Sequence, residues 1–95
     1  MNEKKKKSQV LLDYEEKMSL ENAADFLETI ANKLQEEGSF TLTHGEQSHT
    51  IQPSEQVVLE VKYEKKRSGK MQLELELEWR EGEEGETSSG GLQID

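Results

Sequence analysis

The stretch Met71-Gln-Leu-Glu-Leu-Glu-Leu-Glu-Trp79 decides the fold of this 95-residue chain. Apolar and polar residues alternate along its whole length, and successive side chains of a strand point to opposite faces. The odd-numbered positions, which end on the only tryptophan, therefore share one face, and Gln72 and the glutamates share the other. This pattern predicts a strand that covers a core with one face and meets water with the other.

Similar alternation occurs upstream. We predict strands at residues 10–15, 40–44, 49–53 and 57–64, with Glu60, Lys62 and Glu64 on the outer side of the last of these. Pro53 ends its strand because proline cannot donate a hydrogen bond to a ladder. The break at residues 45–48 and the basic stretch at residues 65–70 are predicted to be turns.

A helix is predicted between Ser19 and Glu37. Its apolar residues recur at helical spacing and fill an arc of about 120°, the width of a stripe that packs on a sheet. Ser19 is a favourable N-cap, Glu21 complements the positive end of the helix dipole, and Gly38 suits the left-handed position after the last turn.

Together these elements predict an α+β fold, in which one amphipathic helix packs on a four- to five-stranded, mainly antiparallel sheet in the order β-α-β-β-β-β. The strand at residues 10–15 pairs beside either residues 40–44 or residues 71–79. With 31% hydrophobic residues, the chain suffices for a thin two-layer core. We expect a disordered basic lead at residues 1–8, one domain at residues 9–80 and a disordered acidic, Gly/Ser-containing tail at residues 81–95.

Composition restricts the classes of function. The chain has no cysteine, which excludes disulfides and thiolate chemistry and favours a cytoplasmic location. No apolar run is long enough to span a bilayer, so no membrane partner is expected. The formal net charge of −9 disfavours nucleic acid as a partner, because phosphate backbones repel an acidic surface.

The chain resembles the amphi-Trp domain, a small prokaryotic family, over roughly residues 8–80. The resemblance is carried by the helix start Ser19-Leu-Glu-Asn-Ala-Ala24, by Gly45-Glu-Gln-Ser48 with Pro53 after it, and by Leu73-Glu-Leu-Glu-Leu-Glu-Trp79. His49 departs from the pattern, since an aliphatic residue is usual there. The resemblance implies a small stand-alone fold and brings no catalytic residues to carry over.

His44 and His49 form the candidate metal site. If residues 45–48 are the hairpin turn, the two imidazoles lie directly opposite each other, close enough to share a zinc or nickel ion. Two ligands are fewer than such sites use, so the favoured interpretation is a pair of partly exposed imidazoles. No cofactor is predicted.

Other polar residues carry less chemistry. The glutamates of the outer sheet face lie on a flat, solvated surface, where catalytic acids lack the enclosed pocket that separates their pKa values, so no catalytic residue is predicted. Lys65, Lys66 and Arg67 form a basic turn whose solvated state is favoured over phosphate binding. Trp79 ends an inward-facing row, which favours a place in the core, although tryptophan is also enriched at binding hot spots.

These observations favour a non-catalytic protein-interaction or adaptor module, with Trp79 and the basic turn at Lys65, Lys66 and Arg67 as interaction residues. The expected partner is another protein, with a homodimer through an exposed strand edge as a further possibility. The alternatives are a small-ligand or metal carrier that uses His44 and His49, and an accessory subunit of a larger enzyme.

Overall fold

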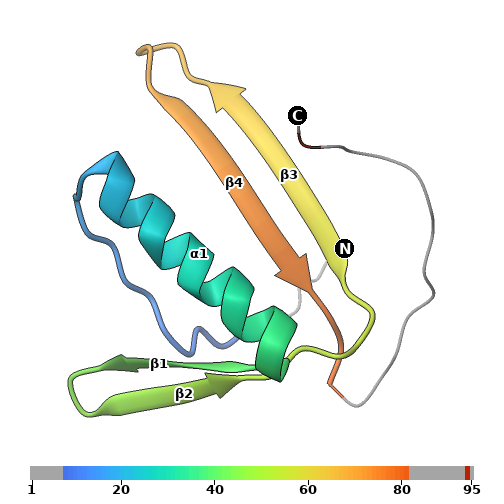
Figure 1. The fold of residues 1–95 in the computed structure, drawn as a ribbon. Helices are drawn as coiled ribbons and strands as arrows, with labels where there is room; N and C mark the ends of the chain where they lie inside the picture. The colour runs from blue at the N-terminus through green and yellow to red at the C-terminus, as the bar shows by residue number, and fades with distance from the viewer. Residues whose placement is uncertain (1–7, 82–93, 95) are drawn as a thin grey trace. The chain divides into compact units, whose positions relative to one another are not determined.

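The computed structural model describes residues 8–81 and 94, which contain one α-helix and four β-strands (Figure 1). The chain divides into two units, the first ending at Ile51 and the second beginning at Gln52. The predicted basic lead and acidic tail lie outside the described residues, apart from residues 8, 81 and 94.

Helix α1 spans Leu20–Glu37, as the sequence predicts. The Ser19 hydroxyl oxygen accepts a hydrogen bond from the backbone N–H of Asn22 at 3.1 Å, which satisfies one of the unpaired donors of the first turn. At the other end Gly38 takes left-handed dihedrals (φ 72°), and its N–H donates to the carbonyls of Lys33 and Leu34. Local signals at both termini therefore define this helix.

Strands β1 (Phe40–His44) and β2 (Gln47–Ile51) form an antiparallel hairpin that follows α1 and contacts it through β1. The turn is only two residues long, and Gly45 has the positive φ (64°) that such tight turns favour. One face carries a row of hydroxyls, in which Thr41 and Thr50 are hydrogen-bonded across the strands at 3.0 Å.

Strands β3 (Val58–Lys65) and β4 (Met71–Glu78) form a second, longer antiparallel hairpin. Its turn is closed by two backbone hydrogen bonds of 2.9 Å, from Lys66 N to Lys70 O and from Gly69 N to Lys66 O. The register places Glu60 opposite Glu76 and Val61 opposite Leu75. The alternation that the sequence predicts for this pair of strands is therefore confirmed.

The predicted first strand is wrong. Residues 10–15 form no strand, and the order of elements begins with the helix. A period of two shows which side chains share a face, but a strand also needs a backbone partner, and no described strand pairs with this segment. The segment contacts β1 through side chains, because the ring of Tyr14 packs on the ring of His44 with their centroids 4.8 Å apart.

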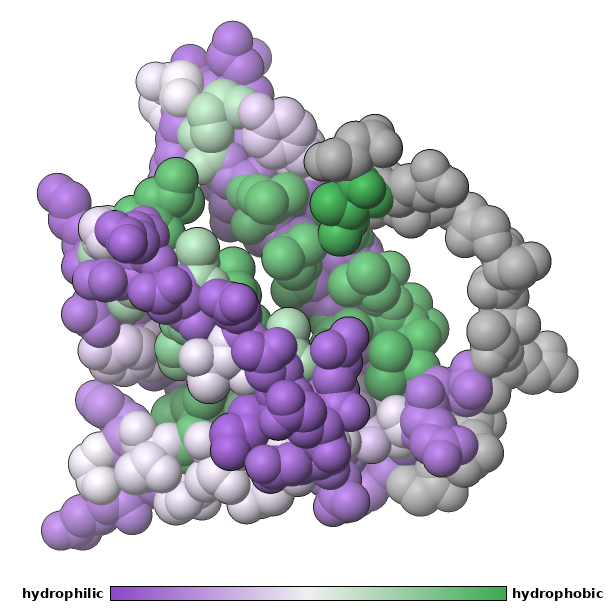
Figure 2. Space-filling view, in the orientation of Figure 1, coloured by the Kyte–Doolittle hydropathy of each residue, from purple (hydrophilic) through white to green (hydrophobic). Residues whose placement is uncertain are grey.

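The prediction that the strands form one sheet is also wrong for the described residues. The strands form two separate two-stranded sheets, β1–β2 and β3–β4, joined by a segment that contains Pro53. No side chain among residues 8–81 and 94 is buried, and within its own unit ribbon β3–β4 has no described helix or further strand on either face. Figure 2 shows green apolar residues lying open on the drawn surface among purple polar ones.

The described part of the chain is thus α+β, with one helix and four antiparallel strands. Within residues 8–81 and 94, no helix combines the length and the apolar character needed to cross a membrane.

Candidate functional site

Hairpin β3–β4 has one face made of large apolar side chains. The cross-strand pairs on it are Leu59 with Leu77, Val61 with Leu75, and Tyr63 with Leu73. Directly opposed apolar and aromatic pairs of this kind stabilise an antiparallel ribbon, each by about 0.2–1 kcal/mol. We call this surface the apolar face, and it consists of Leu59, Val61, Tyr63, Met71, Leu73, Leu75, Leu77 and, just beyond β4, Trp79.

Within its own unit, no other described helix or strand covers the apolar face. Tyr63 is 74% exposed, Leu73 63% and Leu75 56%, whereas Trp79 at the end of the row is 38% exposed. Scattered exposed apolar residues are ordinary on a protein surface, but a contiguous row of them marks an interaction surface. The sequence pattern assigns these residues to a core, and within the second unit they form one continuous face.

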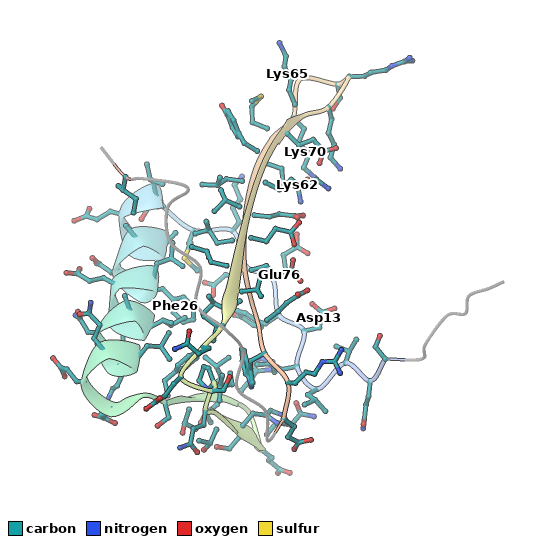
Figure 3. All side chains as sticks on the ribbon, turned by 90° about the vertical axis from the view of Figure 1, so that its right-hand side faces the viewer. Asp13, Phe26, Lys62, Lys65, Lys70 and Glu76 are labelled. Atoms are coloured by element: carbon teal, nitrogen blue, oxygen red, sulfur yellow. The ribbon has the colours of Figure 1, made fainter. Side chains whose placement is uncertain are left out.

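The two ends of the hairpin differ in charge. The turn end carries Lys65, Lys66, Arg67 and Lys70, all exposed, and Lys65 lies opposite Met71 at the edge of the apolar face. Figure 3 shows Lys65 and Lys70 toward the turn end of the hairpin, with Glu76 farther along the strands. The predicted interaction residues of the turn are thus separated from Trp79 by the length of the hairpin.

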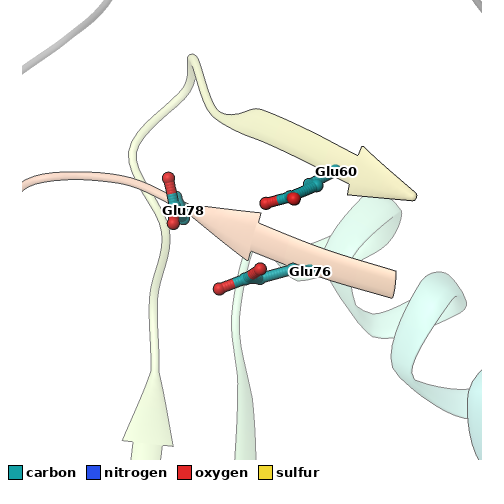
Figure 4. A group of neighbouring side chains, drawn as sticks. All are labelled: Glu60, Glu76 and Glu78. Atoms are coloured by element: carbon teal, nitrogen blue, oxygen red, sulfur yellow. The ribbon is translucent and has the colours of Figure 1, made fainter. Parts of the chain in front are cut away.

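The opposite face of the same hairpin is acidic. Carboxylate oxygens of Glu60, Glu76 and Glu78 lie within 4.8 Å of one another, and Figure 4 shows the three side chains grouped on the two strands. A hydrogen bond with Glu60, followed by the negative charges of Glu60 and Glu78, raises the pKa of Glu76. The sequence predicts that these glutamates share the outer face, and the register sets Glu60 directly opposite Glu76.

This carboxylate cluster is fully open to water. All three glutamates are exposed, and a proton held by Glu76 relieves the repulsion between like charges. Carboxyl groups that act as acid and base need environments that differ, as in an enclosed pocket with one apolar side. Three exposed carboxylates on one face of a ribbon lie in no such pocket.

The two histidines lie on one face of hairpin β1–β2 but not opposite each other. Because the turn is two residues long, His44 pairs with Gln47 and His49 pairs with Leu42. The predicted direct juxtaposition is therefore wrong, and the imidazoles are diagonal neighbours at a longer Cβ separation of about 7–8 Å. Within residues 8–81 and 94, neither belongs to a group of three close metal-ligating side chains.

Tyr14 is a contact residue that the sequence reasoning missed. Its ring packs on His44, and its hydroxyl donates a 2.8 Å hydrogen bond to Oε1 of Glu16, which raises the pKa of Tyr14. The sequence placed Tyr14 in a strand through its spacing from Val10 and Leu12. No local pattern indicates a ring contact with a residue thirty positions away along the chain.

In a comparison with protein families, the model of the Amphi-Trp domain matches residues 5–95, essentially the whole chain. Searches of curated proteins and of solved structures find no match.

Proposed function

We propose that this chain, which belongs to the Amphi-Trp domain family, is a non-catalytic protein-interaction module that binds its partner on the apolar face of β3–β4. The observation that supports the proposal most strongly is the exposure of that face, with Tyr63, Leu73 and Leu75 all more than half exposed. Aromatic anchors inside an apolar surface are typical of protein interfaces, and Trp79 supplies one at the end of the row.

The charges support a partner that is a protein with an apolar surface flanked by carboxylates. The basic turn at Lys65, Lys66 and Arg67 borders one end of the apolar face and would meet acidic groups of a partner. The opposite face is occupied by glutamates and stays in water. Binding by the apolar face therefore leaves the charged face outward in the complex.

A single substitution on the face tests the proposal. Leu75→Asp places a charge at the centre of the apolar face, and Gln72→Asp adds the same charge to the same strand on the other face. A partner captured by the tagged parent chain should be lost with Leu75→Asp and kept with Gln72→Asp, with circular dichroism confirming that both variants retain the parent spectrum. Trp79 fluorescence should shift to shorter wavelength when the purified partner is added. Equal capture by both variants, or an unchanged emission spectrum, would contradict the proposal.

A second candidate function is metal or small-ligand binding at hairpin β1–β2. It is supported by the shared face of His44 and His49, although two imidazoles supply only half of the ligands that a structural zinc site uses. Titration with zinc while recording histidine ring signals by NMR tests this candidate. Perturbation of both rings, abolished by His49→Ala, supports it, whereas unchanged spectra would exclude it.

A further candidate is a role as an accessory subunit of a larger enzyme, which the same capture experiment addresses. Co-purification of an enzyme whose turnover changes on addition of this chain supports that role. A partner without catalytic activity supports the adaptor role.

A further inference from the structure

We propose that the apolar face also binds a second copy of this chain, giving a weak two-fold dimer in which the two β3–β4 hairpins pack face to face and run in opposite directions. This inference rests on the proposed function, because it names one partner for the same surface. It is carried by two features of the hairpin: the continuous apolar row and the opposite charges at its two ends.

The apolar row has the regularity that face-to-face packing of sheets requires. Three consecutive cross-strand pairs, from Leu59–Leu77 to Tyr63–Leu73, present only apolar side chains on this face. Two sheets pack about 10 Å apart with their strands aligned within about 30°, so that the side chains of the two inner faces interdigitate. A second copy offers a surface of the same length and spacing.

The opposite charges at the two ends of the hairpin favour one relative direction of the two copies. The turn end carries four cations: Lys65, Lys66, Arg67 and Lys70. The open end carries three carboxylates at or beside it, namely Glu55, Glu78 and Glu81, and one cation, Arg80, which already interacts with another group. In a two-fold interface, each residue that contacts a partner residue is contacted by it in return. A two-fold axis that lies between the faces and crosses the strands near Val61 and Leu75 sets each basic turn on the acidic end of the other copy. The parallel arrangement would instead oppose two basic turns.

The size of the face sets the strength of this dimer. Each strand has eight residues and spans about 26 Å, and the two strands lie about 4.8 Å apart, so one face offers roughly 300–400 Å². Stable complexes bury about 800 Å² per partner, and interfaces well below this size are weak and transient. We therefore expect a dissociation constant of about 0.1 mM, which leaves the face available to another protein at lower concentration.

Sedimentation equilibrium from about 5 to about 500 µM measures this association directly. The parent chain should change from monomer to dimer over that range, and raising the ionic strength from about 50 to about 500 mM should weaken dimerisation about 3- to 10-fold. Leu75→Glu should abolish the dimer, while the matched change Gln72→Glu on the opposite face should retain it. A dimer whose dissociation constant changes neither with Leu75→Glu nor with salt would indicate pairing through a strand edge and would overturn the inference.

A charge exchange tests the same interface without altering the apolar row. Lys66→Glu, Arg67→Glu and Lys70→Glu together make both ends acidic, because Lys65 is then the one cation of the four that the turn end keeps, and Glu55→Lys with Glu81→Lys makes both ends basic. Each variant alone should stay monomeric, and an equimolar mixture should form a heterodimer. Because the chain contains no cysteine, a mixture of Lys66→Cys and Glu81→Cys should form a mixed disulfide under mild oxidation, whereas a parallel dimer would link two Lys66→Cys chains.

Acrylamide quenching of Trp79 distinguishes failure of this inference from failure of the proposed function. A monomer at the highest concentration, with Trp79 quenched about as fast as free tryptophan, would overturn the dimer and keep the apolar face available to a different protein. A monomer in which Trp79 is protected would show that the face is covered within a single chain, and it would overturn both.

Discussion

Gly38 provides a prediction whose magnitude follows from the structure. It has φ 72° and ψ 10°, and a Cβ built on it would meet nothing within 4 Å. Gly38→Ala therefore introduces no steric clash with neighbouring residues, and its amide still donates to the carbonyls of Lys33 and Leu34. Only the dihedral penalty of an L-residue in the left-handed region remains, about 1–2 kcal/mol.

Part of this penalty is offset, because alanine reduces the conformational entropy of the unfolded chain by about 0.4–1 kcal/mol. The net loss in unfolding free energy for Gly38→Ala is about 0.5–1.5 kcal/mol, which lowers Tm by about 3–10 °C in a domain of this size. Gly38→Asn should cost less, since asparagine tolerates left-handed dihedrals better.

Thermal and urea unfolding followed by circular dichroism at 222 nm measures these differences. Gln35→Ala, at an exposed position of the last turn of α1, serves as the control and should leave Tm nearly unchanged. An unchanged Tm for Gly38→Ala, or a loss above about 3 kcal/mol, would refute the argument that backbone strain alone sets the cost.

Further predictions concern the helix cap, the carboxylates and the ring pair. Ser19→Ala removes the acceptor for the N–H of Asn22 and should lower the unfolding free energy by about 1 kcal/mol in urea titrations, while Ser19→Asp should restore it. The pKa of Glu76 is raised in the folded state, so its contribution to stability is present below the ordinary carboxyl value and is lost as pH rises through the raised one. Glu60→Gln should lower the pKa of Glu76 in a carboxyl ¹³C titration and reduce that loss; an unchanged titration would contradict the assigned cause. Tyr14→Ala should abolish the ring-current shift of the His44 protons in NMR spectra, and a shift that persists would place another ring there.

The parts of the fold that depend on neighbours along the chain could be predicted from the sequence. Ser19, the apolar stripe and Gly38 define α1 within a single segment, and the structure reproduces its bounds. The alternation on both sides of the turn at residues 66–70 likewise predicted which side chains share a face, and the turn then sets Glu60 against Glu76. In each case the signal and the structure that it specifies lie within a few turns or one hairpin.

Features that depend on distant partners were not predictable in the same way. The spacing of Val10, Leu12 and Tyr14 is compatible with a strand, but the backbone partner that makes a strand is absent from the pattern. The predicted pairing of the two histidines is wrong because the turn has two residues instead of four. The shorter turn changes the cross-strand partner of His44 from His49 to Gln47. Register depends on the length of the turn, and Gly45 alone is compatible with both.

The apolar face of β3–β4 is covered by no other described helix or strand of its own unit, which the sequence pattern alone did not indicate. Alternation shows that Leu73, Leu75 and Leu77 share a side, and burial was inferred because apolar faces usually cover a core. The pattern does not distinguish a face that packs within the chain from one that packs on another molecule. That distinction is the basis of the function proposed for this member of the Amphi-Trp domain family.

Labelling of a single cysteine at the centre of the apolar face tests the central claim most directly. In this cysteine-free chain, Leu75→Cys reports that face alone, and Gln72→Cys reports the opposite face of the same strand. The account predicts that a dilute monomer of Leu75→Cys reacts with a thiol reagent within about threefold of Gln72→Cys, and that added partner slows Leu75→Cys selectively. Protection of Leu75→Cys by about 100-fold in the dilute monomer would contradict the account.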